Sequence, residues 1–149
     1  MKYCILFLIL FLALPISAKH LHLEKEYQKF WCNQQGGITE YKLKDNTRVD
    51  CLLSDYAVEV DFAQKVYESI GQALYYGLMT YRQPAVLIII EDDNCQKYVN
   101  RLKIVADKYN IKVWTITPSD IKKLLYKRST PEVHSGIKNT IIILQKTKK

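Results

Sequence analysis

A continuous apolar segment near the middle of the chain restricts the possible folds more than any other feature. Residues 85–90 read Ala-Val-Leu-Ile-Ile-Ile and directly follow Pro84. A strand that is apolar at every position is typical of the centre of a sheet that is covered on both faces. The sequence therefore predicts an α/β protein in which this segment is a central strand and helices lie on both sides of the sheet.

The remaining periodicity places other elements around this strand. Asp45-Asn46-Thr47 and Ser54-Asp55 have the composition of turns, and Gly36-Gly37 is expected to end the first helix. Helices are expected at 21–31, 63–81, 93–109 and 119–126, and further strands at 38–44, 48–53, 56–62, 112–116 and 140–144. An antiparallel meander followed by helical crossovers predicts a mixed central sheet rather than a doubly wound Rossmann fold.

The first eighteen residues differ from the rest of the chain. Residues 4–14 are an unbroken apolar run, preceded by Lys2 and followed by Pro15-Ile16-Ser17-Ala18. This order is typical of a secretory signal peptide, and the run is too short to span a bilayer. We expect cleavage after Ala18, a secreted or periplasmic protein without stable membrane insertion, and one domain over residues 19–149. An uncleaved amphipathic or membrane-anchoring segment is the alternative.

The cysteines fit an exported protein. Removal of residues 1–18 leaves Cys32, Cys51 and Cys95, and an oxidising compartment favours one disulfide with one thiol left over. Cys32 and Cys51 flank the first predicted hairpin, so we expect these two to pair. Three buried free thiols are the alternative, and the spacings do not resemble a zinc site.

Acidic residues concentrate on the second and third predicted strands. Because side chains alternate along a strand, Glu59 and Asp61 share one face, and a hairpin can bring Asp50 beside Glu59. Neighbouring buried carboxylates repel each other, and a hard divalent cation such as Mg²⁺ or Mn²⁺ removes that penalty. The alternative is a pair of solvent-facing acids on a half-exposed sheet.

The helix that follows adds polar side chains to the same region. At about 100° per residue, one polar stripe and one apolar stripe alternate along it. The polar stripe comprises Lys65, Ser69, Gln72 and Tyr76, and its lysine, amide and phenol are expected to face the acids. The apolar stripe, which is expected to dock on the sheet, comprises Val66, Ile70, Ala73 and Gly77.

These residues resemble the PD-(D/E)XK nuclease superfamily, which has the restriction-endonuclease-like fold. The resemblance rests on Gly36-Gly37, Asp50, Glu59-Val60-Asp61, Lys65 and the Gln72-x-x-x-Tyr76 helix motif. It implies an αβββαβ core over residues 21–116, with further βαβ elements at the carboxyl end. It also implies metal ligands at Asp50, Glu59 and the Val60 carbonyl. The family lysine normally stands where this chain has Asp61, and Lys65 on the following helix resembles the migrated lysine of some members.

The implied activity is metal-dependent hydrolysis of phosphodiester bonds in nucleic acid, most simply DNA. Lys65 would orient water or offset charge on the phosphate, Gln72 and Tyr76 would position the reacting groups, and Asp61 would join the metal shell or hold Lys65. The formal charge of +7 at pH 7 favours an anionic partner. Phosphate contacts are expected from Lys42, Lys44, Arg48 and Lys103.

Two other classes of protein remain open. One is an inactive nuclease-fold protein that binds nucleic acid or a protein partner, and the Asp61 departure favours it. The other is a secreted structural or interaction protein whose basic patch lies away from the acids.

Overall fold

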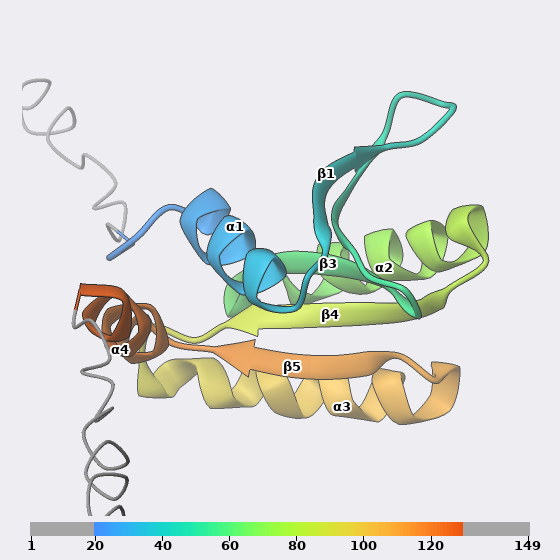
Figure 1. Ribbon diagram of the computed structural model, residues 1–149. Helices are drawn as coiled ribbons and strands as arrows, with labels where there is room; N and C mark the ends of the chain where they lie inside the picture. Colours follow the sequence, from blue (N-terminus) through green and yellow to red (C-terminus); the bar gives the residue numbers. More distant parts are fainter. Residues whose placement is uncertain (1–19, 130–149) are drawn as a thin grey trace, which may run out of the picture. The chain divides into compact units, whose positions relative to one another are not determined.

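The computed structural model describes residues 20–129, so the predicted signal peptide and the predicted strand at 140–144 lie outside the described residues. The elements shown in Figure 1 are α1 (Glu24–Gln34), β1 (Ile38–Lys42), β2 (Arg48–Leu52), β3 (Tyr56–Phe62), α2 (Val66–Thr80), β4 (Gln83–Ile89), α3 (Gln96–Tyr109), β5 (Lys112–Ile116) and α4 (Pro118–Ser129). Their order and types agree with the sequence prediction. The main differences are at helix starts, because 3₁₀ turns at Ala63–Lys65 and Asp93–Cys95 precede α2 and α3.

The sheet is mixed, as predicted, and its strands follow the order β1-β2-β3-β4-β5. β1, β2 and β3 are antiparallel neighbours, whereas β3, β4 and β5 run parallel. β3 pairs with β4 from Tyr56 to Phe62, but its register with β2 comprises Cys51↔Val58 and Leu52↔Ala57. The β1–β2 hairpin therefore bends away from β3 before Cys51, as Figure 1 shows. Asp50 lies at this bend.

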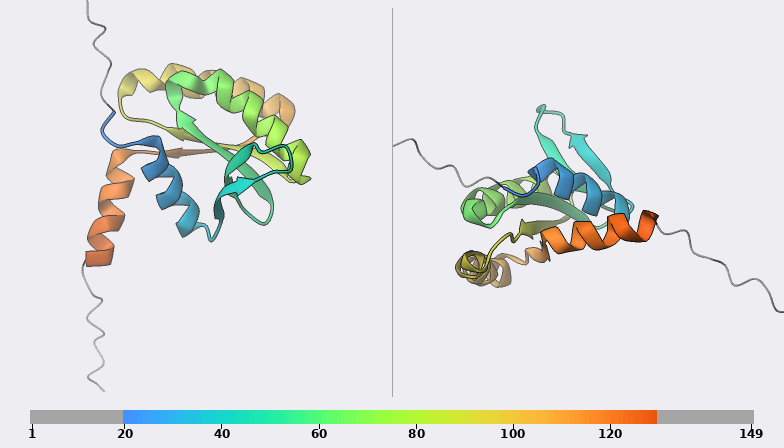
Figure 2. Two further views of the ribbon diagram at one scale, coloured as in Figure 1. Left: turned by 90° about the horizontal axis from the view of Figure 1, so that it is seen from above. Right: turned by 90° about the vertical axis from the view of Figure 1, so that its left-hand side faces the viewer.

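Helices cover both faces of the sheet, which explains the continuous apolar run in β4. Val86 and Ile88 belong to a core cluster that includes α2 and α3 side chains. On the other face α1 lies over the sheet, with the Trp31 ring centroid 5.1 Å from that of Trp114 on β5. Figure 2 shows α2 and α3 on one side of the sheet and α1 on the other. The prediction of a fully covered central strand is confirmed.

The apolar stripe of α2 docks on the sheet as expected. Val66 and Ala73 are buried in the core cluster and Ile70 packs against it. Gly77 lies where the helix meets the start of β4, and a Cβ at this position would lie 3.1 Å from atoms of Pro84 and Arg82. Glycine thus allows the end of α2 to approach β4 closely.

The predicted Cys32–Cys51 disulfide is confirmed, and Cys95 is buried and free. The bridge joins α1 to β2 with a Cα–Cα distance of 5.6 Å. Gly37 passes directly beside it, because a Cβ there would lie 2.7 Å from the Cys32 sulfur and 2.6 Å from the Cys51 sulfur. The glycine pair that ends α1 therefore also makes room for the bridge.

We expect the Cys32→Ser/Cys51→Ser double variant to lose about 3 kcal/mol of unfolding free energy, because the bridge reduces the number of conformations that the unfolded chain can adopt. Urea unfolding of both proteins would measure this loss. Peptide mapping without reductant should find the linked peptide and an unmodified Cys95 thiol. Three alkylatable thiols in the native protein would contradict the assignment.

The chain divides into two compact units, with the boundary between Pro118 and Ser119. The sheet, α1, α2 and α3 belong to the first unit, and most of α4 belongs to the second. The single domain over residues 19–149 stays a prediction. Within residues 20–129, no helix has both the length and the apolar character needed to cross a membrane.

Candidate functional site

Two carboxylates meet where the β1–β2 hairpin leaves the sheet. Asp50 on β2 accepts a hydrogen bond from the Val60 backbone N–H through Oδ2 at 2.8 Å, and its carboxyl also hydrogen-bonds that of Glu59 on β3. The Glu59 residue is only 5% exposed. The expected juxtaposition of Asp50 and Glu59 is confirmed, and the alternative of solvent-facing acids on a half-exposed sheet is wrong. The reason is that α2 covers this face.

The environment of the pair opposes its ionisation. Burial raises the pKa of Glu59 to about 10, and the charges of Asp50, Asp61 and Glu24 act in the same direction. Burial also raises the pKa of Asp50 to about 7, although the hydrogen bond from Val60 lowers it. Because the two carboxyl groups interact directly, they titrate as a unit. Such a pair is a favourable place for positive charge.

α2 adds two of the predicted residues to the pair. The Gln72 amide lies against the Glu59 carboxyl, and with its nitrogen toward Glu59 it donates to Oε2 at 3.2 Å and also to Oε1. Tyr76 is buried, and burial together with the Glu59 and Asp50 charges raises the pKa of its hydroxyl to about 12. Its side chain packs in a cluster with Leu43, Val49, Leu52 and Ala57.

Ser69, the fourth residue of the polar stripe, is fully buried, and its hydroxyl donates to the Val66 backbone carbonyl at 2.9 Å. Lys65 ends a 3₁₀ turn that precedes α2 rather than lying inside the helix.

Lys65 contacts the next acid along β3. Its Nζ lies 3.3 Å from Asp61 Oδ1 and 3.5 Å from Glu24 Oε2 on α1. Desolvation lowers the pKa of Lys65, but the two carboxylates outweigh it and the net pKa is raised. Burial and a hydrogen bond to Glu24 raise the pKa of Asp61 to about 7 despite Lys65. Of the two predicted roles of Asp61, the geometry favours holding Lys65.

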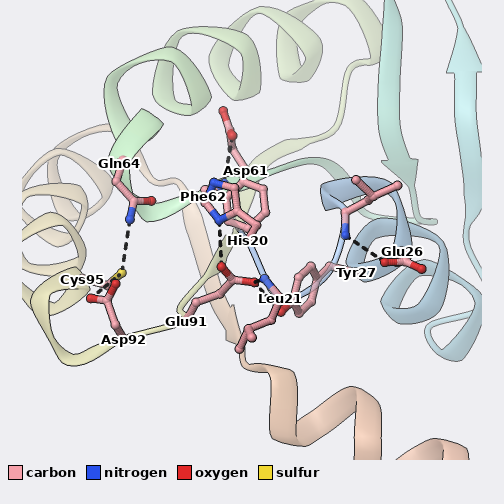
Figure 3. Close-up of polar contacts among 11 residues, drawn as sticks. His20, Leu21, Glu26, Tyr27, Asp61, Phe62, Gln64, Glu91, Asp92 and Cys95 are labelled. Carbon is pink, nitrogen blue, oxygen red and sulfur yellow. Dashed lines mark hydrogen bonds and ion pairs between the residues drawn. The ribbon is translucent and has the colours of Figure 1, made fainter. Parts of the chain in front are cut away.

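The start of α1, which carries Glu24, is anchored by a separate polar network (Figure 3). Glu91 accepts hydrogen bonds from His20 Nδ1 at 2.7 Å, the Leu21 backbone N–H at 3.0 Å and the Tyr27 hydroxyl at 3.0 Å. The His20 ring stacks on Phe62 with centroids 3.6 Å apart. Phe62 directly follows Asp61, whose Oδ1 accepts the Phe62 N–H at 2.8 Å. This network fixes the segment that leads into Glu24.

α1 also supplies a buried amide that the sequence reasoning missed. Gln28 is 4% exposed, and its Nε2 donates to the Asp50 backbone carbonyl at 2.8 Å and to Glu40 Oε1 at 3.0 Å. Nε2 also lies 3.4 Å from Asp50 Oδ1. Glu40 has a positive φ of 55°, which is uncommon for a side chain of this kind. Gln28 therefore ties the Asp50 segment to α1.

The fit of this donor set to Mg²⁺ or Mn²⁺ depends on how many carboxylates the ion needs. Among residues 20–129, no group of three or more His, Cys, Asp or Glu side chains is arranged to hold a metal ion. Asp61 contacts Lys65 and the Phe62 N–H instead. Mg²⁺, however, usually keeps several waters and binds through one or two carboxylates plus substrate phosphates. The Asp50–Glu59 pair fits that mode, and the Val60 carbonyl ligand stays a prediction.

The predicted phosphate-binding residues are all exposed. Lys42, Lys44 and Arg48 lie on the β1–β2 hairpin, and Lys103 lies on α3. Arg48 is two residues from Asp50 and its Nη1 lies 3.4 Å from the Glu40 carbonyl oxygen. Of these four residues, Arg48 is the one that shares a strand with Asp50.

We expect the stability of the metal-free protein to fall as the pH rises. The raised pKa of Glu59 means that the folded state binds more protons than the unfolded state between pH 4.5 and about 10. The contribution of Glu59 to the free energy of unfolding is therefore fully present below pH 4.5 and declines above it. The decline from this group is at most about 1.4 kcal/mol per pH unit. Urea unfolding in EDTA at pH 5 and pH 8 would measure the decline, which should be shallower in Glu59→Gln. Parallel declines in the two proteins would contradict this prediction.

Comparison of the chain with models of protein families, with curated proteins and with solved structures gave no match.

Proposed function

We propose that the chain is a metal-dependent nuclease of the PD-(D/E)XK type that hydrolyses phosphodiester bonds in nucleic acid. The observation that carries the proposal is the buried Asp50–Glu59 pair on adjacent strands, with Gln72 of the following helix against Glu59. Buried carboxylates without a counter-charge are costly, and paired carboxylates next to exposed basic side chains suit a cation and a phosphate.

The arrangement of the elements supports the same proposal. The order α1-β1-β2-β3-α2-β4 is the αβββαβ core that the resemblance implies. Asp50 and Glu59 occupy the second and third strands of this core, and Gln72 and Tyr76 lie on its second helix. Export fits the disulfide and the apolar amino-terminal run, so we propose that the protein acts outside the cytosol.

Asp50 and Glu59 would hold Mg²⁺ or Mn²⁺, which when bound polarises a phosphoryl oxygen and lowers the pKa of a water. Gln72 would orient the Glu59 carboxylate, and Gln28 would hold the Asp50 backbone. Lys65 would offset the negative charge that develops on the phosphate. Lys42 and Arg48 would hold the substrate backbone without reading sequence.

An inactive nuclease-fold protein that binds nucleic acid is the second candidate. The observation that favours it is the position of Lys65, whose amine is engaged by Asp61 and Glu24. A lysine that is neutralised by two carboxylates has less charge to offer a phosphate.

A cleavage assay tests the proposal. The oxidised protein is incubated with supercoiled plasmid and with single-stranded DNA and RNA, in Mg²⁺, in Mn²⁺ and in EDTA. We expect cleavage with either metal and none with EDTA. Glu59→Gln, purified identically, controls for contaminating nucleases. Nucleic-acid binding without cleavage under all conditions would favour the inactive candidate.

A further inference from the structure

The outer face of α2 is unusually poor in charge for an exposed helix. The helix contains one acidic residue, Glu68, and no basic residue. Tyr67, Tyr75 and Leu78 are 65%, 39% and 76% exposed, respectively. Steps of four and three residues separate positions 67, 71, 75 and 78, so they form one stripe along the helix. A solvent-facing helix normally carries charged side chains on this side.

Gly71 lies between the two tyrosines, and nothing among residues 20–129 requires a glycine there. It lies inside a regular helix, and a Cβ at this position would have no atom within 4 Å. Glycine in a helix interior costs about 1 kcal/mol relative to alanine. A glycine that neither packing nor backbone conformation demands leaves open space above the helix, which suits close approach of a ligand.

Positive charge borders this stripe on the side of the β1–β2 hairpin. The hairpin, with Lys42 and Lys44, packs on α2 through Leu43 and Tyr76, and the Tyr75 hydroxyl donates to Asp45 of the hairpin turn.

The stripe is continuous with the carboxylate pair. Gln72 directly follows Gly71 and is exposed, yet its amide contacts Glu59. A polymeric ligand that lies along α2 would therefore pass Gln72, whose amide contacts the carboxylate pair. The distance along the helix from Tyr67 to Tyr75 is about 12 Å.

We infer that the outer face of α2, which comprises Tyr67, Gly71 and Tyr75, binds a single-stranded segment of nucleic acid. This inference rests on the proposed function, because it names the substrate class of that site. Exposed aromatic rings beside positively charged side chains bind single strands by base stacking, whereas the bases of a duplex are already stacked and are not available to the rings. The open space above Gly71 accommodates the sugar-phosphate backbone.

The test measures binding separately from cleavage. Labelled 15-nucleotide oligo-dT, oligo-U and a blunt DNA duplex are titrated in EDTA with the oxidised protein, and fluorescence anisotropy is recorded. We expect tighter binding of both single strands than of the duplex, and the two single strands show whether DNA or RNA is preferred. Tyr67→Ala should weaken single-strand binding about tenfold or more, because one stacked base is lost.

Gly71→Leu provides a variant that improves the helix while it blocks the surface. It should raise the thermal midpoint and weaken single-strand binding about tenfold or more, because the side chain fills the open space. Tyr109→Ala is the matched control, since this tyrosine is 58% exposed at the end of α3, and it should leave binding unchanged.

Several results would overturn the inference. They are equal binding of duplex and single strands, no binding of single strands, or no effect of Tyr67→Ala and Gly71→Leu. Oligonucleotide binding could also stay intact in Tyr67→Ala and Gly71→Leu. If these variants then lose self-association in light scattering, the stripe is assigned to a second copy of the chain. If they lose binding to anionic vesicles, it is assigned to a membrane surface. If the protein binds single strands through Tyr67 but cleaves no substrate under any condition, the proposed nuclease activity is refuted. The inference that the stripe binds single strands then still stands.

Discussion

Glu59→Gln is expected to abolish metal-dependent cleavage while it makes the metal-free protein more stable. The substitution removes the carboxyl whose ionisation is opposed by burial and keeps the shape of the side chain beside Gln72. A metal ion contributes several kcal/mol of transition-state charge stabilisation, so the rate should fall by about a thousandfold or more. Cleavage rates in Mg²⁺ and urea unfolding in EDTA at pH 8 would measure the two effects.

The matched control for this variant is Glu68→Gln, which removes an exposed carboxylate from α2 and should change neither quantity. Asp50→Asn is the corresponding change on β2. Asparagine retains an oxygen that can accept the buried Val60 N–H, whereas alanine would leave that donor unsatisfied at a cost of about 1–3 kcal/mol. Full cleavage by carefully purified Glu59→Gln would refute the proposed site.

Lys65→Ala is expected to lower kcat by about a hundredfold without weakening metal binding. The proposed role of the amine is to offset charge in the transition state, and loss of one such group typically costs about that factor. The Lys65 side chain is 51% exposed but that of Asp61 is 6% exposed, so loss of the amine should also destabilise the fold by leaving a buried carboxylate without its counter-charge. Single-turnover rates and Mn²⁺ titration would separate rate from affinity.

Two further variants sharpen this prediction. Lys29→Ala, which removes an exposed lysine from α1, is the control for loss of positive charge. Asp61→Lys should not rescue Lys65→Ala, because its amine would approach from β3 rather than from the turn before α2. An unchanged kcat in Lys65→Ala would show that this lysine has no part in the chemistry.

The strands and the carboxylate pair were predictable because they depend on local patterns. Alternation along β3 placed Glu59 and Asp61 on one face, and the turn at residues 54–55 placed β2 beside it. The continuous apolar run of β4 predicted cover on both faces. Each of these inferences uses a period of two residues and a short connection, which a single sequence records directly.

The contributions of α1 were not predictable in the same way. Gln28 and Glu24 reach Asp50 and Asp61 from a helix that is distant in sequence from β3, and helical periodicity does not tell which residue a buried amide contacts. The only available signal was a polar residue at position 28 between the apolar residues Tyr27 and Trp31 on the buried face. The 3₁₀ turn that ends at Lys65 was not predictable either, because three residues are too few to distinguish it from the start of an α-helix by periodicity.

The disulfide has a consequence beyond its effect on stability. Cys51 directly follows Asp50, and its partner Cys32 lies one helical turn from Gln28, which donates to the Asp50 carbonyl. The bridge and the amide together fix one carboxylate of the pair at a position where β2 has few backbone bonds to β3. Thiol oxidation is therefore an assembly step for the site itself. A chain kept reduced in the compartment of its synthesis would hold Asp50 loosely, and its chemistry would begin only once the surroundings became oxidising.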